Sequence, residues 1–196
     1  MKKIIVLSLF LLSLWCGGHA VAESSIETFT AFHEKCIVVD ISEQKLLLYE
    51  GGSVVKRYPV STGKNGIGQI QDSGKTPLGM HYIKRKVGDM SPPGMIFTLG
   101  GPTGEVWNPD IVNVDDDLVL TRVMMLAGIE EGINKGTNAQ GRVVDSFQRY
   151  IWIHGTNHEE KIGKPASKGC IRMKKDDIVE LYALVAEGSS VLIIAV

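Results

Sequence analysis

The stretch IWIHGTNHEEKIGKPASKGCIRM, residues 151–173, carries the densest pattern in the chain. Its opening run, residues 151–153, is typical of a buried strand and places His154 at the end of that strand. Further along the stretch, Gly169 precedes Cys170 and permits a tight turn. The stretch therefore predicts a strand and a turn that bring a histidine and a cysteine into one site.

The two side chains suit acyl transfer. A free thiol has a pKa of about 8.5, and an imidazole beside it can take its proton and generate the nucleophile. In this interpretation Cys170 is the nucleophile and His154 is its base. Gly169 would let nearby backbone N–H groups point at the developing oxyanion. Arg172 would lie on the same side of an extended segment, where its fixed charge suits a substrate carboxylate.

N-terminal to this stretch, short β-branched or alternating runs indicate a sheet. We expect strands at residues 37–41, 45–49 and 54–60. The connections at residues 42–44 and 50–52 have the length of hairpin loops. This part of the chain is predicted to form an antiparallel meander.

The middle of the chain is less regular. A Gly-rich stretch at residues 61–79 and a Pro/Gly segment around residues 91–94 are expected to be surface loops near a site. A strand is predicted between them at residues 80–84. A short helix is predicted between residues 118 and 132.

The C-terminal elements follow clear patterns. Asp176 or Asp177 is expected to cap a helix that ends near Gly188. Residues 191–196 then form an apolar closing strand. The helix carries apolar residues at helical spacing, namely Ile178, Leu181, Tyr182 and Val185. The predicted fold is one mostly β, sandwich-like domain with a C-terminal α-helix and a closing strand.

The N-terminus has the three parts of a secretory signal: basic residues, an apolar run at residues 4–15 and small residues at 20–22. A membrane-spanning helix needs about 20 apolar residues, so cleavage is favoured over an anchor. We expect residues 1–22 to be a signal peptide, residues 23–35 a short N-terminal segment and residues 36–196 the catalytic domain. No integral membrane segment is expected after cleavage.

The charge balance restricts the class of binding partner, and the cysteine content bears on the state of the thiols. The 21 basic and 22 acidic residues nearly balance, which argues against nucleic acid as a partner. Beyond the signal, Cys36 and Cys170 form an even pair that an oxidising compartment could bridge. Because Cys36 opens an apolar run, the favoured interpretation is a buried reduced thiol there and a functional one at Cys170.

The decisive stretch resembles the signature of YkuD-type L,D-transpeptidases, an H-G-T element followed by S-x-G-C-[IV]-R-[ML]. Residues 37–46 resemble that family's opening hairpin, and residues 59–64, 76–79 and 149–154 resemble later elements. The resemblance covers most of residues 36–196.

The resemblance implies an exported, periplasmic or envelope enzyme that acts on peptidoglycan stem peptides. Cys170 would attack the third residue of a stem tetrapeptide and release D-alanine, while the Gly155 carbonyl would orient the imidazole of His154. The acyl group would pass to an amine on another stem, giving a 3→3 cross-link, to the lysine of an envelope lipoprotein, or to water.

Four further roles follow from the resemblance. Ser167, Lys168 and Gly169 would shape the oxyanion pocket, and Arg172 would contact a stem carboxylate. Many relatives have histidine where this chain has Lys168. Two alternatives stay open, because Ser167 can simply stabilise the turn and Arg172 can pair with an acid.

Other motifs fit their simpler interpretations. Residues 73–76 resemble the end of a phosphate-binding loop, but the required earlier glycine is absent. His154 and His158 lack the helix and glutamate of a zinc motif, and the acids at 115–117 lack calcium-loop spacing. No metal or cofactor is expected.

The rival functions are an L,D-carboxypeptidase or hydrolase that uses the same acyl-enzyme, and a non-catalytic peptidoglycan-binding protein with Cys170 buried or bridged.

Overall fold

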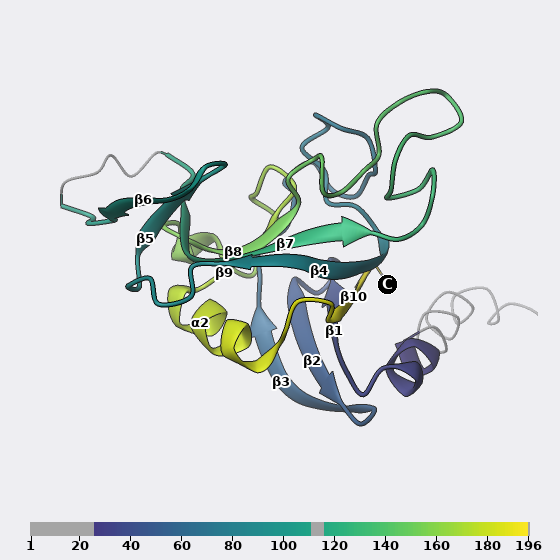
Figure 1. Ribbon diagram of the computed structural model, residues 1–196, viewed down its shortest axis with the longest axis horizontal. Coiled ribbons are helices and arrows are strands. Elements are labelled where there is room, and N and C mark those ends of the chain that lie inside the picture. The colour runs from purple at the N-terminus through teal and green to yellow at the C-terminus, as the bar shows by residue number, and fades with distance from the viewer. Residues whose placement is uncertain (1–25, 111–115, 196) are drawn as a thin grey trace, which may run out of the picture.

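The computed structural model describes residues 26–110 and 116–195 (Figure 1). The predicted signal at residues 1–22 lies outside them. Residues 26–32 are helical and precede the first strand. Among the described residues, no helix combines the length and the apolar character needed to cross a membrane.

After residue 32, the described part of the chain forms ten strands, one short 3₁₀ helix and one longer C-terminal helix, in chain order. They are β1 (Lys35–Asp40), β2 (Lys45–Glu50), β3 (Ser53–Pro59), β4 (Gly79–Val87), β5 (Met95–Thr98), β6 (Gly101–Val106), β7 (Val119–Gly128), β8 (Trp152–Thr156), η1 (Glu159–Lys161), β9 (Ile171–Met173), α2 (Lys175–Leu184) and β10 (Ser190–Ile194). The prediction of a mostly β domain with a C-terminal helix and a closing strand is confirmed.

All ten strands belong to one connected mixed sheet, in the order β3-β2-β1-β10-β4-β7-β5-β6, with β8 paired to β7 and β9 paired to β8. The predicted antiparallel meander of β1, β2 and β3 is confirmed. The closing strand β10 is also confirmed, and it lies parallel to β1 and antiparallel to β4. The chain's last strand thus joins the meander to the part of the sheet that carries the candidate site.

The predicted helix between residues 118 and 132 is wrong. These residues form the long strand β7, which pairs with β4 and β5 and, through a register shift, with β8. The β-branched Thr121 and Val123 favour a strand, and partners satisfy backbone groups on both of its edges. Tertiary pairing has overridden a weak local helical pattern.

The predicted cap of the C-terminal helix is also wrong. Lys174 occupies the N-cap position without a side-chain cap, while Asp176 and Asp177 lie in the first turn, where their charges favour the helix dipole. The helix ends at Leu184, and Gly188 (φ +86°) lies in the turn beyond it.

The main core combines side chains of the β1–β3 meander, of β7, β8 and β9, and of helix α2. Ile37 of β1, Ile153 of β8, Ile171 of β9 and Leu181 of α2 are fully buried in one cluster. Helix α2 packs on β7 and β8 and lies below them in Figure 1. The helix therefore supports the back of the strands whose other face carries the candidate site.

His81 on β4 is buried in a polar contact. Its Nδ1 lies 3.0 Å from the carbonyl of Gly79, and its Nε2 lies 2.9 Å from the hydroxyl of Ser146. Because a carbonyl can only accept, Nδ1 carries the proton and Nε2 accepts from Ser146. Burial lowers the pKa of His81 to about 4.

We predict that this histidine makes folding stability pH-dependent. The unfolded chain binds a proton near pH 6.5 and the folded chain near pH 4, so stability is full above pH 6.5 and falls as the pH drops toward 4. The loss from His81 is about 3 kcal/mol. Urea unfolding between pH 4 and 7 should show a flatter profile for His81→Gln than for the wild type. Parallel profiles would contradict the prediction.

Candidate active site

The parallel pairing of β8 and β9 determines which face carries the candidate catalytic side chains. Ile153 is in register with Ile171, and His154 with Arg172. Ile153 and Ile171 point into the main core, so His154 and Arg172 point to the opposite face. Cys170, two residues before Arg172, shares that face and packs against the cluster that contains Trp152.

His154 and Cys170 are therefore diagonal neighbours on one sheet face. The strand spacing and the rise per residue put their backbones about 8 Å apart, a separation that an imidazole and a thiol can bridge with their side chains. Neither cysteine is in a disulfide. Cys36 is buried in a separate cluster with Val38 and Leu192, so the two cysteines have different surroundings.

The imidazole of His154 is buried and held in one orientation. Its Nδ1 lies 2.7 Å from the carbonyl oxygen of Gly155, the contact that the resemblance implied. Because that oxygen can only accept, Nδ1 is the protonated nitrogen, and in the neutral ring Nε2 keeps a free lone pair. This is the tautomer that a general base requires.

Gly155 is needed for close packing behind His154. A Cβ at this position would lie 2.7 Å from the carbonyl oxygen of Leu120 and 3.2 Å from a methyl carbon of Ile178. This close contact between β8 and β7 occurs at a register shift in β7, where Thr121 has a φ of +73°. A β-branched residue in that region is strained, and the hydroxyl of Thr121 accepts a hydrogen bond from the Gly94 N–H.

The turn before Cys170 is held by Ser167. Its hydroxyl donates to the Cys170 carbonyl at 2.6 Å and accepts from the Gly169 N–H at 3.0 Å. Gly169 has a φ of +123°, and a Cβ there would lie 3.0 Å from the Lys75 carbonyl oxygen. Ser167 therefore stabilises the turn, which is the structural alternative that the sequence left open.

The Gly-rich loop at residues 61–79 packs against this turn and is hydrogen-bonded to it. The hydroxyl of Thr76 donates to the Gly169 carbonyl at 2.9 Å and accepts from the Gly63 N–H at 2.8 Å. Arg149 donates to the carbonyls of Gln69 and Lys75, at 2.7 Å each. Thr76 and Arg149 lie in segments that carry the family resemblance, but the sequence assigned them no role, because no local pattern marks a side chain that binds a distant backbone.

The thiol of Cys170 donates a hydrogen bond to the Tyr150 carbonyl at 3.2 Å. Tyr150 has a φ of +56°, an uncommon conformation for a residue other than glycine, and this strain aims its carbonyl at the sulfur. In the free protein the thiol proton is therefore directed toward a backbone oxygen.

Burial keeps both reacting groups neutral. Desolvation and, to a smaller extent, the charge of Asp117 raise the pKa of the Cys170 thiol to about 11, against the lowering effects of the Trp152 backbone and the charges of Arg172 and Arg149. Burial also lowers the pKa of His154 to about 4. The sequence led us to expect a thiol ionised near neutral pH, whereas these pKa values favour a neutral thiol beside a neutral imidazole.

The two cations at the site are placed differently. The guanidinium of Arg172 is ion-paired with Asp117, and its side chain is 4% exposed. This is the acid pairing that the sequence kept as an alternative to substrate contact. Lys168 is exposed on the outside of the turn. Asp117 was not anticipated as a partner.

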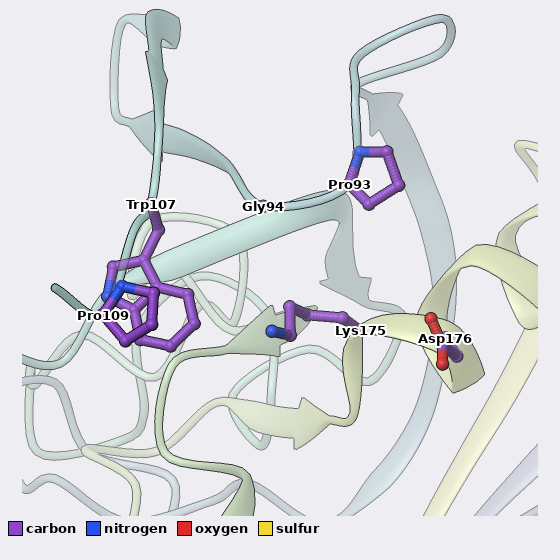
Figure 2. A pocket seen from close by; sticks show the side chains of 6 residues that line it. All are labelled: Pro93, Gly94, Trp107, Pro109, Lys175 and Asp176. Carbon is purple, nitrogen blue, oxygen red and sulfur yellow. The ribbon is translucent and has the colours of Figure 1, made fainter.

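A pocket of about 300 Å³ lies at the far end of β9 from Cys170. Figure 2 shows Trp107 and Pro109 on one side and Lys175 and Asp176, at the start of α2, on another. The ammonium of Lys175 lies 4.7 Å from the centre of the Trp107 ring. The pocket combines an aromatic wall with one charge of each sign.

The other motifs noted in the sequence make structural contacts where the structure describes them. His158 binds the carboxylate of Glu160 at 3.2 Å. Within residues 26–110 and 116–195, no three His, Cys, Asp or Glu side chains are grouped to hold a metal. Residues 73–76 are part of the loop that clasps the Cys170 turn. Asp115 of the acidic run lies outside the described residues.

A sheet that presents a thiol and a singly protonated imidazole on one face has the groups of a cysteine acyl-transfer enzyme. Residues 34–193 match the L,D-transpeptidase catalytic domain family, YkuD. The chain belongs to this family, whose members are cysteine transpeptidases.

Curated relatives resemble the chain over most of its length. A Bacillus licheniformis protein named for L,D-transpeptidase YkuD is 29% identical over 157 residues, which cover 80% of this chain and 64% of that protein. The YcfS protein of Escherichia coli K12, also named as an L,D-transpeptidase, is 28% identical over 160 residues, which cover 81% and 43%. The chain thus spans less than two thirds of the length of either relative.

Solved structures resemble the chain at low identity. An L,D-transpeptidase from Mycobacterium smegmatis has a TM-score of 0.48 and 17% identity, with 83% of this chain and 59% of that chain covered. The catalytic domain of the Enterococcus faecium L,D-transpeptidase has a TM-score of 0.46 and 18% identity, with 83% and 98% covered.

We predict that Thr76 positions the nucleophile turn. Thr76→Val keeps the shape but leaves the Gly63 N–H and the Gly169 carbonyl unpaired, which should cost about 1–3 kcal/mol of stability. It should also slow alkylation of Cys170 in the folded protein several-fold. Thr76→Ser keeps the hydroxyl and should restore both properties. A normal alkylation rate in Thr76→Val would refute the positioning role.

The pKa values predict how Cys170 responds to pH. With the thiol pKa near 11 and the imidazole pKa near 4, iodoacetamide alkylation should accelerate steadily from pH 6 to 9. A thiolate–imidazolium pair would instead give a plateau by pH 6. The rate should be measured in Cys36→Ala protein, so that Cys170 is the thiol followed. A plateau at acidic pH would contradict the neutral pair.

Proposed function

We propose that the protein is a peptidoglycan L,D-transpeptidase of the cell envelope that forms an acyl-enzyme on Cys170. The observation that carries the proposal is the shared sheet face of Cys170 and His154, with the imidazole in the tautomer that leaves Nε2 free. Membership of the L,D-transpeptidase family supports stem peptides as substrates.

In the acylation step, Nε2 of His154 takes the thiol proton as the sulfur attacks the carbonyl carbon of the third stem residue. The carbon–nitrogen bond to the terminal D-alanine then breaks. His154 returns its proton to the departing amine, which leaves a thioester on Cys170. Because the resting pair is neutral, proton transfer accompanies the attack and does not precede it.

In the transfer step, an acceptor amine attacks the thioester and gives a proton to Nε2 of His154. The carbon–sulfur bond breaks, and Cys170 recovers its proton. The amine would come from another stem, giving a 3→3 cross-link, or from the lysine of an envelope lipoprotein. Water in place of the amine makes the same intermediate an L,D-carboxypeptidase.

Backbone N–H groups at the turn would stabilise the oxyanion. The Gly169 N–H is already bonded to Ser167, so the N–H of Cys170 is the more available donor. Ser167 and Gly169 would shape the pocket by holding the turn. The charge of Arg172 lowers the pKa of Cys170, but that of its ion-pair partner Asp117 raises it more, so the pair by itself does not favour the thiolate.

The rival non-catalytic interpretation required Cys170 to be buried or bridged to Cys36. Both cysteines are free, and Cys170 is only partly buried. These two properties favour a chemical role for Cys170. Export through a signal at residues 1–22 remains part of the proposal, in keeping with a cell-wall substrate.

The proposal predicts a covalent adduct on Cys170. Wild-type protein incubated with a stem tetrapeptide should gain the mass of the tripeptide acyl group and release D-alanine, and Cys170→Ala should do neither. His154→Gln should lower the acylation rate at least 100-fold, because it removes the base. Formation of cross-linked product by Cys170→Ala protein would sink the proposal.

A competing amine separates transfer from hydrolysis. With a second stem present as acceptor, a transpeptidase should yield the cross-linked dimer. Tripeptide alone, at every acceptor concentration, would assign the hydrolase activity instead.

A further inference from the structure

Four lysines lie on the two segments that meet at the turn that carries Cys170. They are Lys64 and Lys75 on the Gly-rich loop and Lys164 and Lys168 on the segment leading to the nucleophile, and we call them the lysine rim. Lys64, Lys164 and Lys168 are exposed, and Lys75 is half-buried.

Backbone contacts bring the rim together. The Lys64 N–H donates to the Ser167 carbonyl at 2.9 Å. The Lys164 carbonyl accepts from the Ser61 hydroxyl at 2.7 Å. The Lys75 carbonyl lies 3.0 Å from where a Cβ at Gly169 would be. The backbones of lysines that are distant in sequence therefore lie close to the Cys170 turn.

The rim lysines differ from the others in their partners. Elsewhere in residues 26–110 and 116–195, the remaining lysines have an ion pair, a hydrogen bond, an aromatic ring or a nearby acid for the ammonium group. Those lysines are Lys35, Lys45, Lys56, Lys84, Lys86, Lys135, Lys161, Lys174 and Lys175. Within the same residues, the four rim ammonium groups have none of these. In a chain with a net charge of −1, the uncompensated lysine charge is concentrated beside the nucleophile.

The site's other candidate for binding carboxylates is engaged. Arg172 is ion-paired with Asp117 and almost fully buried, so a substrate carboxylate would have to displace Asp117 to reach it. Lys168, two residues before Cys170, faces solvent and needs no such exchange. The rim is therefore the more accessible cationic surface.

We propose that the lysine rim recognises the free carboxylates of acidic stem peptides, with Lys168 nearest the reacting bond, so that amidated stems bind less well. The inference rests on the proposed function and specifies its substrate class. Exposed ammonium–carboxylate pairs are individually weak, but several acting together raise the association rate and make binding sensitive to salt.

Binding can be measured without turnover in Cys170→Ala protein. The probes are a fluorescent stem tetrapeptide with free carboxylates and the same peptide with those carboxylates amidated. At 20 mM salt the acidic peptide should bind about tenfold more tightly. The difference should shrink at 300 mM salt, where the screening length is shorter. Equal affinities at low salt would overturn the proposal.

Variants locate the effect. Lys64→Gln/Lys168→Gln should remove most of the preference for the acidic peptide, measured in the same variant as the ratio of the dissociation constants of the amidated and the acidic peptide. Arg85→Gln is the control for loss of an exposed positive charge away from the rim, because Arg85 is exposed on β4, and β7 and β8 separate β4 from β9. The control should keep the preference, and an equal loss in the control would refute the rim.

Acylation of the wild-type protein, measured by mass spectrometry, distinguishes failure of the lysine-rim proposal from failure of the transpeptidase proposal. If Cys170 is acylated by both peptides at equal rates and binding shows no preference, the rim fails and the transpeptidase proposal stands. If neither peptide acylates Cys170 while the binding preference persists, the rim stands and the transpeptidase proposal fails.

Discussion

The parallel register of β8 and β9 is the constraint on which the site depends. It aligns His154 with Arg172 and turns both away from the core that Ile153 and Ile171 fill. A shift by one residue would turn the imidazole into the apolar core and place an isoleucine on the face that carries Cys170. The core thus fixes which side chains face the site. Helix α2 completes the core by packing on β7 and β8.

The sequence predicted the elements whose pattern is local. The alternating runs of β1, β2 and β3 and the closing strand β10 were recognisable because each shows strand periodicity between turn residues. Helix α2 was recognisable from its apolar spacing, although not its cap. Strand β7 was mistaken for a helix because its conformation is imposed by the partners on both of its edges.

The candidate site was predictable only in part. Spacing and chemistry singled out Cys170 and His154, but their partners come from distant segments. Thr76 reaches a carbonyl 93 residues away, and Asp117 pairs with a residue 55 positions later. Neither the twisted backbone of Tyr150 nor the desolvation that keeps the thiol neutral has a signature in sequence, because both arise from packing.

The hydrogen bond from the Cys170 thiol to the Tyr150 carbonyl also bears on durability. Peroxides and disulfides react with the anionic form of sulfur, and the neutral form is far less susceptible. A sulfur held with its proton against a backbone oxygen is thereby protected while idle. Under the proposed mechanism it becomes reactive only when a substrate in the site draws that proton toward the imidazole, so the sulfur is shielded from oxidation between turnovers.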